Sequence, residues 1–310
     1  MAFKTRLIAT LYRSNGTLHS KFRSEFFNIG LCLFLFELTV KASVKIQELS
    51  EEGLSLKMSK NADFNSIYNS DLQLKSARNH VALFERVTSE EFKISYSLVK
   101  SRTMLSIERL YDLYLGVKYV NQAEIQGAIL EVGVWKGGAL GMALLSDTTN
   151  ERKVIGFDTF EGHYAPNSDE VDIHGNNMLH AYQDFVRGGN GWAKASESDC
   201  YDFLISLTKK VESDSSIHPL RVNLVRGDIK ETAKNFPYTP LAILRLDCDW
   251  YPESLASLKY FWPMLQPKGL LIMDDYGHHS GQKKAFDEYF FDKVIKITHV
   301  DYSCILVQKI

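Results

Sequence analysis

The sequence predicts an α/β fold in which a mostly parallel sheet follows a helical N-terminal extension. From residue 128, short apolar runs alternate with segments of helical pattern, which is the order of a doubly wound sheet. Most of these runs are continuously or nearly continuously apolar, as suits strands that are buried on both faces. We expect these strands at residues 129–134, 154–157, 220–225, 241–246 and 270–273.

Helices are expected between these strands and before them. The helical patterns lie at residues 138–146, 198–212, 229–235, 252–265 and 282–291. The last two apolar runs, 294–297 and 304–307, have no long helix between them, so we expect an antiparallel C-terminal end to the sheet.

The first 120 residues lack strand patterns and are expected to form the helical extension, partly mobile, before a domain at 121–310. Residues 97–120 carry apolar side chains at helical spacing, and an apolar face of this kind is compatible with a homo-oligomer. Another apolar segment, 26–40, is shorter than the ~20 residues that a membrane-spanning helix needs, and Glu37 interrupts it. We therefore expect a buried or interface helix there and no membrane span, with a targeting segment as the alternative because the preceding residues are basic.

The composition excludes some classes of protein. The 310 residues hold 36 Lys and Arg against 38 Asp and Glu, and this balance disfavours a nucleic-acid partner. The 4 cysteines are far apart, which disfavours disulfides and a cysteine zinc site. A reducing compartment such as the cytoplasm fits this pattern.

A glycine turn follows the first expected strand. Glu131, Gly133, Gly137 and Gly138 form the pattern E-x-G-x-x-x-G-G, which is typical of S-adenosyl-L-methionine (SAM) binding. The spacing is neither the G-x-G-x-x-G of nicotinamide cofactors nor a P-loop, so a nucleotide-sugar oxidoreductase is excluded. A tight turn without a ligand is the alternative.

Acidic residues follow the second and third strands. Asp158 ends the second strand, where an acid can bond both ribose hydroxyls, although a helix N-cap is the alternative. Gly227 and Asp228 end the third strand, near the expected adenine edge, but Gly-Asp is also ordinary turn chemistry.

Four carboxylates follow the last two parallel strands: Asp247, Asp249, Asp274 and Asp275. Neighbouring strands lie about 4.8 Å apart, so these groups meet if the strands are neighbours. Carboxylates this close need a counterion, and oxygen ligands favour Mg²⁺ or another divalent cation. Helix capping is the alternative for some of them.

Residues 162–192 are rich in glycine and polar side chains and are long for a connection within a domain, so we expect a lid or disorder. His278 and His279 come shortly after the last carboxylates. They are candidates for outer ligands, for acid–base groups or for ordinary helix-start residues.

The segments GVWKGG, FDTFEG, LRLDCDWYPES, PKGLLIMDDYG and GQKKAFDEYF, in this order, resemble the macrocin O-methyltransferase family. The resemblance implies a Rossmann-like class I SAM-dependent methyltransferase fold. It also implies metal-dependent methylation of a hydroxyl on a sugar or a glycosylated natural product. The acceptor would then be a small molecule or a glycan.

The resemblance also implies roles for single residues. Asp247, Asp274 and Asp275 correspond to metal ligands, and Asp249 corresponds to the general base. Glu131, Gly133 and Asp158 correspond to residues of the SAM site. His278 or His279 would take part in the transfer of the acceptor's proton. Trp250 stands where the family more commonly has leucine, which bears on the acceptor pocket.

Two other functions stay open at this point. A catechol or phenol O-methyltransferase also uses SAM and Mg²⁺. A non-catalytic protein of the same fold is disfavoured, because it would have lost the acids or the glycine turn that this sequence retains.

Overall fold

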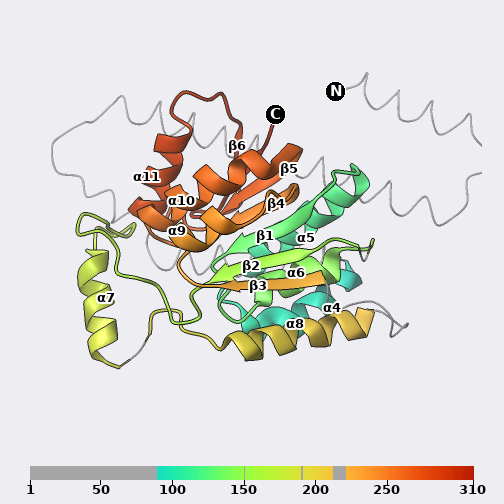
Figure 1. Ribbon diagram of the computed structural model, residues 1–310, viewed down its shortest axis with the longest axis horizontal. Helices are drawn as coiled ribbons and strands as arrows, with labels where there is room; N and C mark the ends of the chain where they lie inside the picture. The colour runs from blue at the N-terminus through green and yellow to red at the C-terminus, as the bar shows by residue number, and fades with distance from the viewer. Residues whose placement is uncertain (1–88, 150, 190, 212–220) are drawn as a thin grey trace, which may run out of the picture. The chain divides into compact units, whose positions relative to one another are not determined.

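The computed structural model describes residues 89–149, 151–189, 191–211 and 221–310, which contain a sheet with helices on both faces (Figure 1). The expectations for residues 1–88, including the apolar segment 26–40, lie outside the described residues. Among the described residues, no helix is long and apolar enough to cross a membrane.

The sheet has the strand order β3-β2-β1-β4-β5-β7-β6. The first five strands in this order run parallel, and β7 pairs antiparallel with both β5 and β6. The mostly parallel sheet with an antiparallel C-terminal end is therefore confirmed. The strands are β1 (Ala128–Val132), β2 (Val154–Asp158), β3 (Val222–Arg226), β4 (Leu241–Leu246), β5 (Leu265–Met273), β6 (Ile297–His299) and β7 (Ile305–Gln308).

Helices cover both faces of this sheet (Figure 1). One face carries α4 (Glu90–Val99), α5 (Ile107–Gln122), α6 (Gly138–Ser146) and α8 (Glu197–Val211). The other carries α9 (Ile229–Thr232), α10 (Tyr251–Phe261) and α11 (Ser280–Tyr289). Single 3₁₀ turns lie at Lys100–Arg102, Ala233–Asn235 and Trp262–Met264. The remaining helix, α7 (Met178–Arg187), belongs to the segment 162–192 and lies to the side of the sheet.

Several boundaries differ from the expectation, among them that of β5, which begins at Leu265 and not at residue 270. The helix expected at 97–120 begins at Ile107, because the Ser106 side chain accepts the N–H of Arg109 and caps the helix there. The helix expected at 252–265 ends at Phe261, where Pro263 follows in a 3₁₀ turn. The strand expected at 294–297 lies instead at Ile297–His299.

Two apolar cores hold the sheet in place. Leu110 of α5 and Leu140 of α6 are buried on one face, and Leu258 of α10 and Phe286 of α11 are buried on the other. Each such side chain contributes about 1.5–3 kcal/mol by leaving water. Because both faces are packed, the carboxyl ends of the strands are held in fixed positions.

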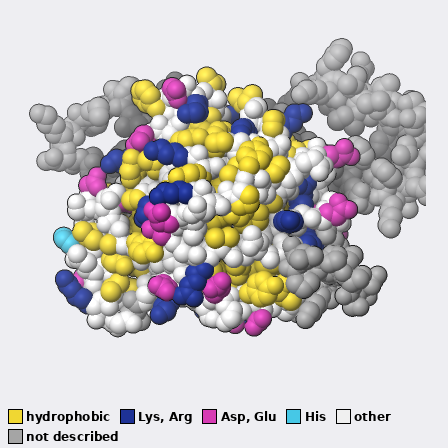
Figure 2. Space-filling model, in the orientation of Figure 1, with side chains coloured by type: hydrophobic (Ala, Val, Ile, Leu, Met, Phe, Trp, Pro, Cys, Tyr) yellow, Lys and Arg dark blue, Asp and Glu magenta, His cyan; other side chains and the backbone are white. Residues whose placement is uncertain are grey.

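The surface carries charges of both signs. On the face shown in Figure 2, basic and acidic side chains are interspersed with apolar and uncharged groups. The expected absence of a nucleic-acid partner stays a prediction.

Asp112 on α5 provides a test of the burial of this helix against the sheet. Its Oδ2 is buried with no hydrogen-bond partner among the described residues, and burial, together with nearby Asp301, raises its pKa to about 7. Because the unfolded chain loses this proton near pH 4, the folded state loses stability as pH rises from there to about 7. Asp112→Asn should therefore gain about 2 kcal/mol over the native protein between pH 5 and pH 8.

Urea unfolding at the two pH values measures this difference. Asp287→Asn, which removes a carboxylate from the surface of α11, is the control. An Asp112→Asn effect that is the same at both pH values would contradict the prediction.

Candidate functional site

A half-open cavity lies at the carboxyl ends of β1, β2 and β3, with about 460 Å³ of empty space that includes open solvent. Of the residues expected to bind SAM, it is lined by Gly133, Asp158, Gly227 and Asp228. Glu131 does not line this cavity; its carboxylate is buried in the interior, so its contact with a cofactor stays a prediction.

The turn after β1 is held by close backbone contacts. Gly133 has φ +89°, and a Cβ at this position would lie 1.7 Å from the carbonyl oxygen of Asp247. The N–H groups of Val134 and Trp135 both donate to Oδ2 of Asp158, at 2.8 Å each. The glycine therefore allows the end of β1 to approach the segment after β4 closely. Asp158, at the end of β2, holds the turn after β1 in place through these two hydrogen bonds.

Asp158 has a structural role in addition to the one expected. Its Oδ1 accepts the N–H of Phe160 at 2.6 Å, so three backbone groups already bond this carboxylate. An ionised carboxylate has about four acceptor sites. A ribose hydroxyl could use only the remaining capacity, and this contact stays a prediction.

A buried guanidinium joins the ends of three strands. Arg245 of β4 donates to Glu131, to Oδ2 of Asp247 at 3.0 Å and to Oδ1 of Asp274 at 2.5 Å. Burial raises the pKa of Glu131 to about 8 even though Arg245 opposes this change. Burial and the Asp247 charge raise the pKa of Asp274 to about 6.

A second guanidinium comes from α5. Arg109 donates to Oδ2 of Asp274 at 2.5 Å and to Oδ2 of Asp301 at 2.6 Å. Both carboxylate oxygens of Asp274 are thus paired with arginines. The helix before the sheet domain therefore reaches directly into the carboxylate cluster.

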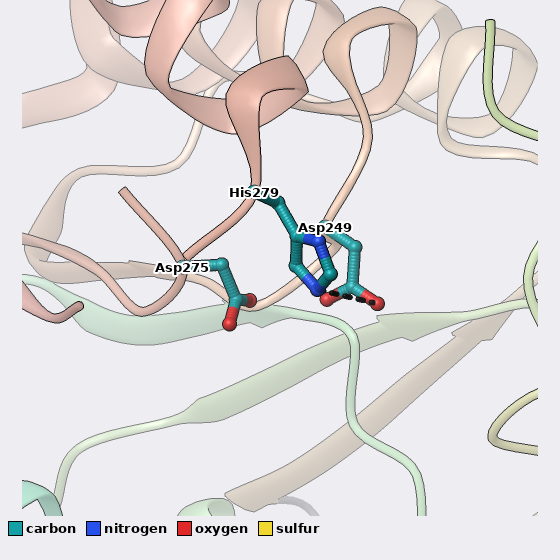
Figure 3. Close-up of side chains that lie close together, drawn as sticks. All are labelled: Asp249, Asp275 and His279. Atoms are coloured by element: carbon teal, nitrogen blue, oxygen red, sulfur yellow. Dashed lines mark ion pairs between the residues drawn. The ribbon is translucent and has the colours of Figure 1, made fainter. Parts of the chain in front are cut away.

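Asp249 lies close to two imidazoles, those of His163 and His279. Its Oδ2 is 3.8 Å from Nε2 of His163 and 3.9 Å from Nε2 of His279. Burial opposes ionisation of Asp249, but these imidazoles outweigh it and hold its pKa below the usual range. Burial and the charge of Asp249 raise the pKa of Asp275 well above its usual range. Figure 3 shows Asp249, Asp275 and His279 facing one another.

Within the part of the chain that the structure describes, two groups of side chains could hold a cation. One is the expected set Asp247, Asp274 and Asp275, and the other is Asp249, Asp275 and His279. In each group, one ligand atom per residue lies within 4.8 Å of the others. Oδ2 of Asp275 is buried with no hydrogen-bond partner among the described residues, which is the state of a carboxylate oxygen that a cation could satisfy.

The structure separates the two consecutive histidines. His279 is 7% exposed and lies beside Asp249, whereas His278 is partly exposed, with Nδ1 3.2 Å from the Tyr302 hydroxyl. The catalytic role expected for His278 stays a prediction. His163 gave no signal in the sequence beyond its place in the expected lid.

Trp250 is fully buried among these groups. Its ring centroid lies 5.0 Å from that of His279, 5.9 Å from that of His163 and 6.0 Å from that of Trp192. Its ring thus packs against both imidazoles near Asp249 and contacts residues at both ends of the segment 162–192.

The fold is that of the Rossmann-like class I SAM-dependent methyltransferases, with the cavity and the carboxylates at the strand ends where such folds bind ligands. The solved structure of the O-methyltransferase NovP is 25% identical, with a TM-score of 0.54 over 67% of this chain and 82% of that chain. The family described as macrocin-O-methyltransferase (TylF) matches residues 57–309. The chain therefore belongs to the macrocin-O-methyltransferase family.

Two characterised relatives share part of the sequence. Mycinamicin III 3''-O-methyltransferase of Micromonospora griseorubida is 30% identical over 182 residues, which are 57% of this chain and 65% of the relative. The 8-demethyl-8-(2,3-dimethoxy-alpha-L-rhamnosyl)-tetracenomycin-C 4'-O-methyltransferase of Streptomyces olivaceus is 28% identical over 182 residues, 57% of this chain and 63% of the relative. The match thus spans less than two thirds of either relative.

Gly133→Ala tests the contact between β1 and the segment after β4. The added Cβ meets the Asp247 carbonyl and a positive φ, so we expect a loss of about 2–5 kcal/mol in the free energy of unfolding. Gly175→Ala is the matched control, because Gly175 has φ +81° with nothing within 4 Å of its added Cβ. It should lose only about 1 kcal/mol in the same urea titration. Equal losses would show that the close approach is not required.

Arg245→Met tests the buried charge network. It leaves Glu131 and Asp274 without their shared partner, and we expect a loss of about 3–5 kcal/mol in the free energy of unfolding. The control is Arg226→Met, because Arg226 pairs with Glu161 at the surface and should contribute less than about 1 kcal/mol. Thermal unfolding of both variants compares them, and a loss as small as the control's would rule out the network.

Proposed function

We propose that this chain is a SAM-dependent O-methyltransferase that uses a divalent cation and methylates a hydroxyl of a sugar or glycosylated natural product. One observation carries the proposal: the cavity and the carboxylate cluster are adjacent. Gly133 lines the cavity while its backbone touches the carbonyl of Asp247. A methyl donor in the cavity would therefore lie next to groups that can bind and deprotonate an acceptor.

The proposed cofactor contacts are those that line the cavity: Gly133, Asp158, Gly227 and Asp228. Asp228 also caps α9 by accepting the N–H of Lys230 at 2.9 Å, which leaves its second oxygen near Lys230 Nζ, at 3.3 Å. The proposed cation ligands are Asp247, Asp274 and Asp275, and the unpartnered Oδ2 of Asp275 supports a cation in this cluster. When bound, SAM supplies an activated methyl group and the cation lowers the pKa of an acceptor hydroxyl.

Asp249 is proposed as the general base. Each methyl transfer releases one proton from the acceptor hydroxyl, and an ionised carboxylate can accept it. The lowered pKa of Asp249, caused by its two imidazole neighbours against the effect of burial, keeps it ionised near neutral pH. His278, whose ring packs edge-on against His279 at 4.6 Å, is proposed to pass the proton towards solvent.

Residues 162–192 are proposed as a lid on a methyltransferase domain at 121–310. The N–H of His163 donates to the Trp192 carbonyl at 2.8 Å, so the two ends of this segment are joined. The described cysteines, Cys200, Cys248 and Cys304, are buried and free, which supports a reducing compartment such as the cytoplasm.

The first measurement is a calorimetric titration of SAM with and without Mg²⁺, followed by turnover with methyl-labelled SAM. Sugar-bearing acceptors such as mycinamicin III form one panel and catechols form the other. Asp249→Asn should reduce kcat at least about 10²-fold and change the Kd for SAM less than about twofold. Asp287→Asn, which changes a surface carboxylate that does not line the cavity, is the control and should keep both values.

The other outcomes identify the alternatives. Turnover of the catechol panel alone would indicate a phenol-type enzyme. An absence of SAM binding in either condition would favour a non-catalytic protein of this fold. Loss of SAM binding in Asp249→Asn would make Asp249 structural, and full activity in a chelator would remove the cation from the proposal.

A further inference from the structure

Helices α10 and α11 begin beside the carboxylate cluster, and neither is capped by the side chain that precedes it. The N-cap of α10 is Trp250, next to Asp249, and the N-cap of α11 is His279. Neither of these N-cap side chains accepts a hydrogen bond from its helix. The first N–H groups of a helix have no partner within it, so these two helix starts depend on acceptors from elsewhere in the chain.

Acceptors for both helix starts come from consecutive residues of the segment 162–192. Oε2 of Glu170 accepts the N–H of Tyr251, the first residue of α10, at 3.2 Å. The carbonyl oxygen of Val171 accepts the N–H of Ser280, the first residue of α11, at 2.9 Å. The Ser280 hydroxyl in turn accepts the N–H of Val171 at 2.8 Å. This segment therefore caps both helices at one point.

The Glu170 carboxylate is buried between the two helix starts. Glu170 is 3% exposed, and its Oε1 also accepts the N–H of Asn167 at 3.0 Å. A Cβ at Gly281, in the first turn of α11, would lie 1.8 Å from Oε2 of Glu170 and 2.7 Å from the backbone nitrogen of Tyr251. The carboxylate thus fills the space between the first turns of α10 and α11, and only a glycine leaves room for it.

Backbone groups alone hold this carboxylate. Among the described residues, no lysine or arginine forms an ion pair with Glu170, and the acids near it are Glu253 and Asp169. Burial raises the pKa of Glu170, whereas the N–H groups of Asn167 and Tyr251 lower it. A buried carboxylate is costly unless hydrogen bonds compensate for the lost water, so Glu170 and the start of α10 stabilise each other.

We propose that Glu170 is a positioning residue for methyl transfer, because it fixes the chain segments that carry Asp249 and His279 relative to each other. Asp249 is two residues before Tyr251, and His279 immediately precedes Ser280. Glu170 does not line the cavity, so it acts through these segments and not on the methyl donor. The inference rests on the proposed function, in which Asp249 is the general base.

Glu170→Ala, with Asp169→Asn as the matched control, tests the proposal in the full chain. Asp169 also reaches α11, but through a surface pair with Lys284 at 3.3 Å. In Glu170→Ala, kcat should fall about ten- to a hundredfold as Asp249 loses its alignment, while the Kd for SAM changes less than about twofold. Asp169→Asn should keep both values.

Glu170→Gln keeps the shape of the side chain and guards against a folding defect. Its amide offers one acceptor oxygen for two backbone N–H groups, so we expect a loss of kcat that is smaller than in Glu170→Ala. A Gln variant as active as the native protein would contradict the need for both oxygens.

Hydrogen exchange provides a measurement that is independent of activity. In the native protein, we expect the amides of Tyr251 and Ser280 to be protected, although they have no acceptor within their own helices. Glu170→Ala should speed exchange at Tyr251 at least about tenfold. Exchange in β4 should stay unchanged, which shows that the variant is folded.

The outcomes separate this inference from the proposed function. Fast exchange at Tyr251 in the native protein, or unchanged exchange in Glu170→Ala, overturns the inference. A native kcat in Glu170→Ala, an equal loss in Asp169→Asn, or a joint loss of SAM binding and kcat also overturns the positioning role. If the native protein binds no SAM or methylates no acceptor, the proposed function fails, and hydrogen exchange still decides whether Glu170 holds the two helix starts.

Discussion

The rest of the site depends on the buried ion pairs of Arg245. In the sheet, Glu131 of β1 lies opposite Arg245 of β4, and the guanidinium also reaches Asp247 and Asp274. A buried guanidinium without carboxylates would cost several kcal/mol, and so would each carboxylate without the guanidinium. Each partner is therefore tolerated only because the others are present, and the carboxyl ends of β1, β4 and β5 are fixed relative to one another.

That constraint explains why two different sites lie side by side. The strand order reverses between β1 and β4, so the crevice at this point is flanked by β2 and β3 on one side and by β5 on the other. The cavity occupies the first side, and the carboxylates occupy the second. Gly133 is the point of contact, because a residue without Cβ allows the backbone after β1 to touch Asp247.

The sequence predicts what local patterns encode. The bounds of α6 and β4 agree with the expected ranges, since a glycine pair and a continuous apolar run mark them. It also predicts which acids meet, because the carboxyl ends of parallel strands share one edge. It does not predict the Arg245 network, whose partner Glu131 is 114 positions away, although a charge within an apolar strand was a visible signal. The approach of His163 to Asp249 depends on how a long connection folds, which no periodicity describes.

The geometry of Asp249 links residues 162–192 to the carboxylate cluster. Asp249 has φ +57°, a left-handed conformation that costs a non-glycine residue about 1–2 kcal/mol and persists only where its surroundings hold it. Those surroundings are His163 at one end of residues 162–192, His279 at the start of α11, and the Trp250 ring, which packs against both imidazoles. Trp192, at the other end of the segment, packs on the same Trp250 ring. Both ends of residues 162–192 therefore contact the groups that hold Asp249, and residues 162–164 also line the cavity, so the conformation of this segment bears on the cavity and on the carboxylate beside it.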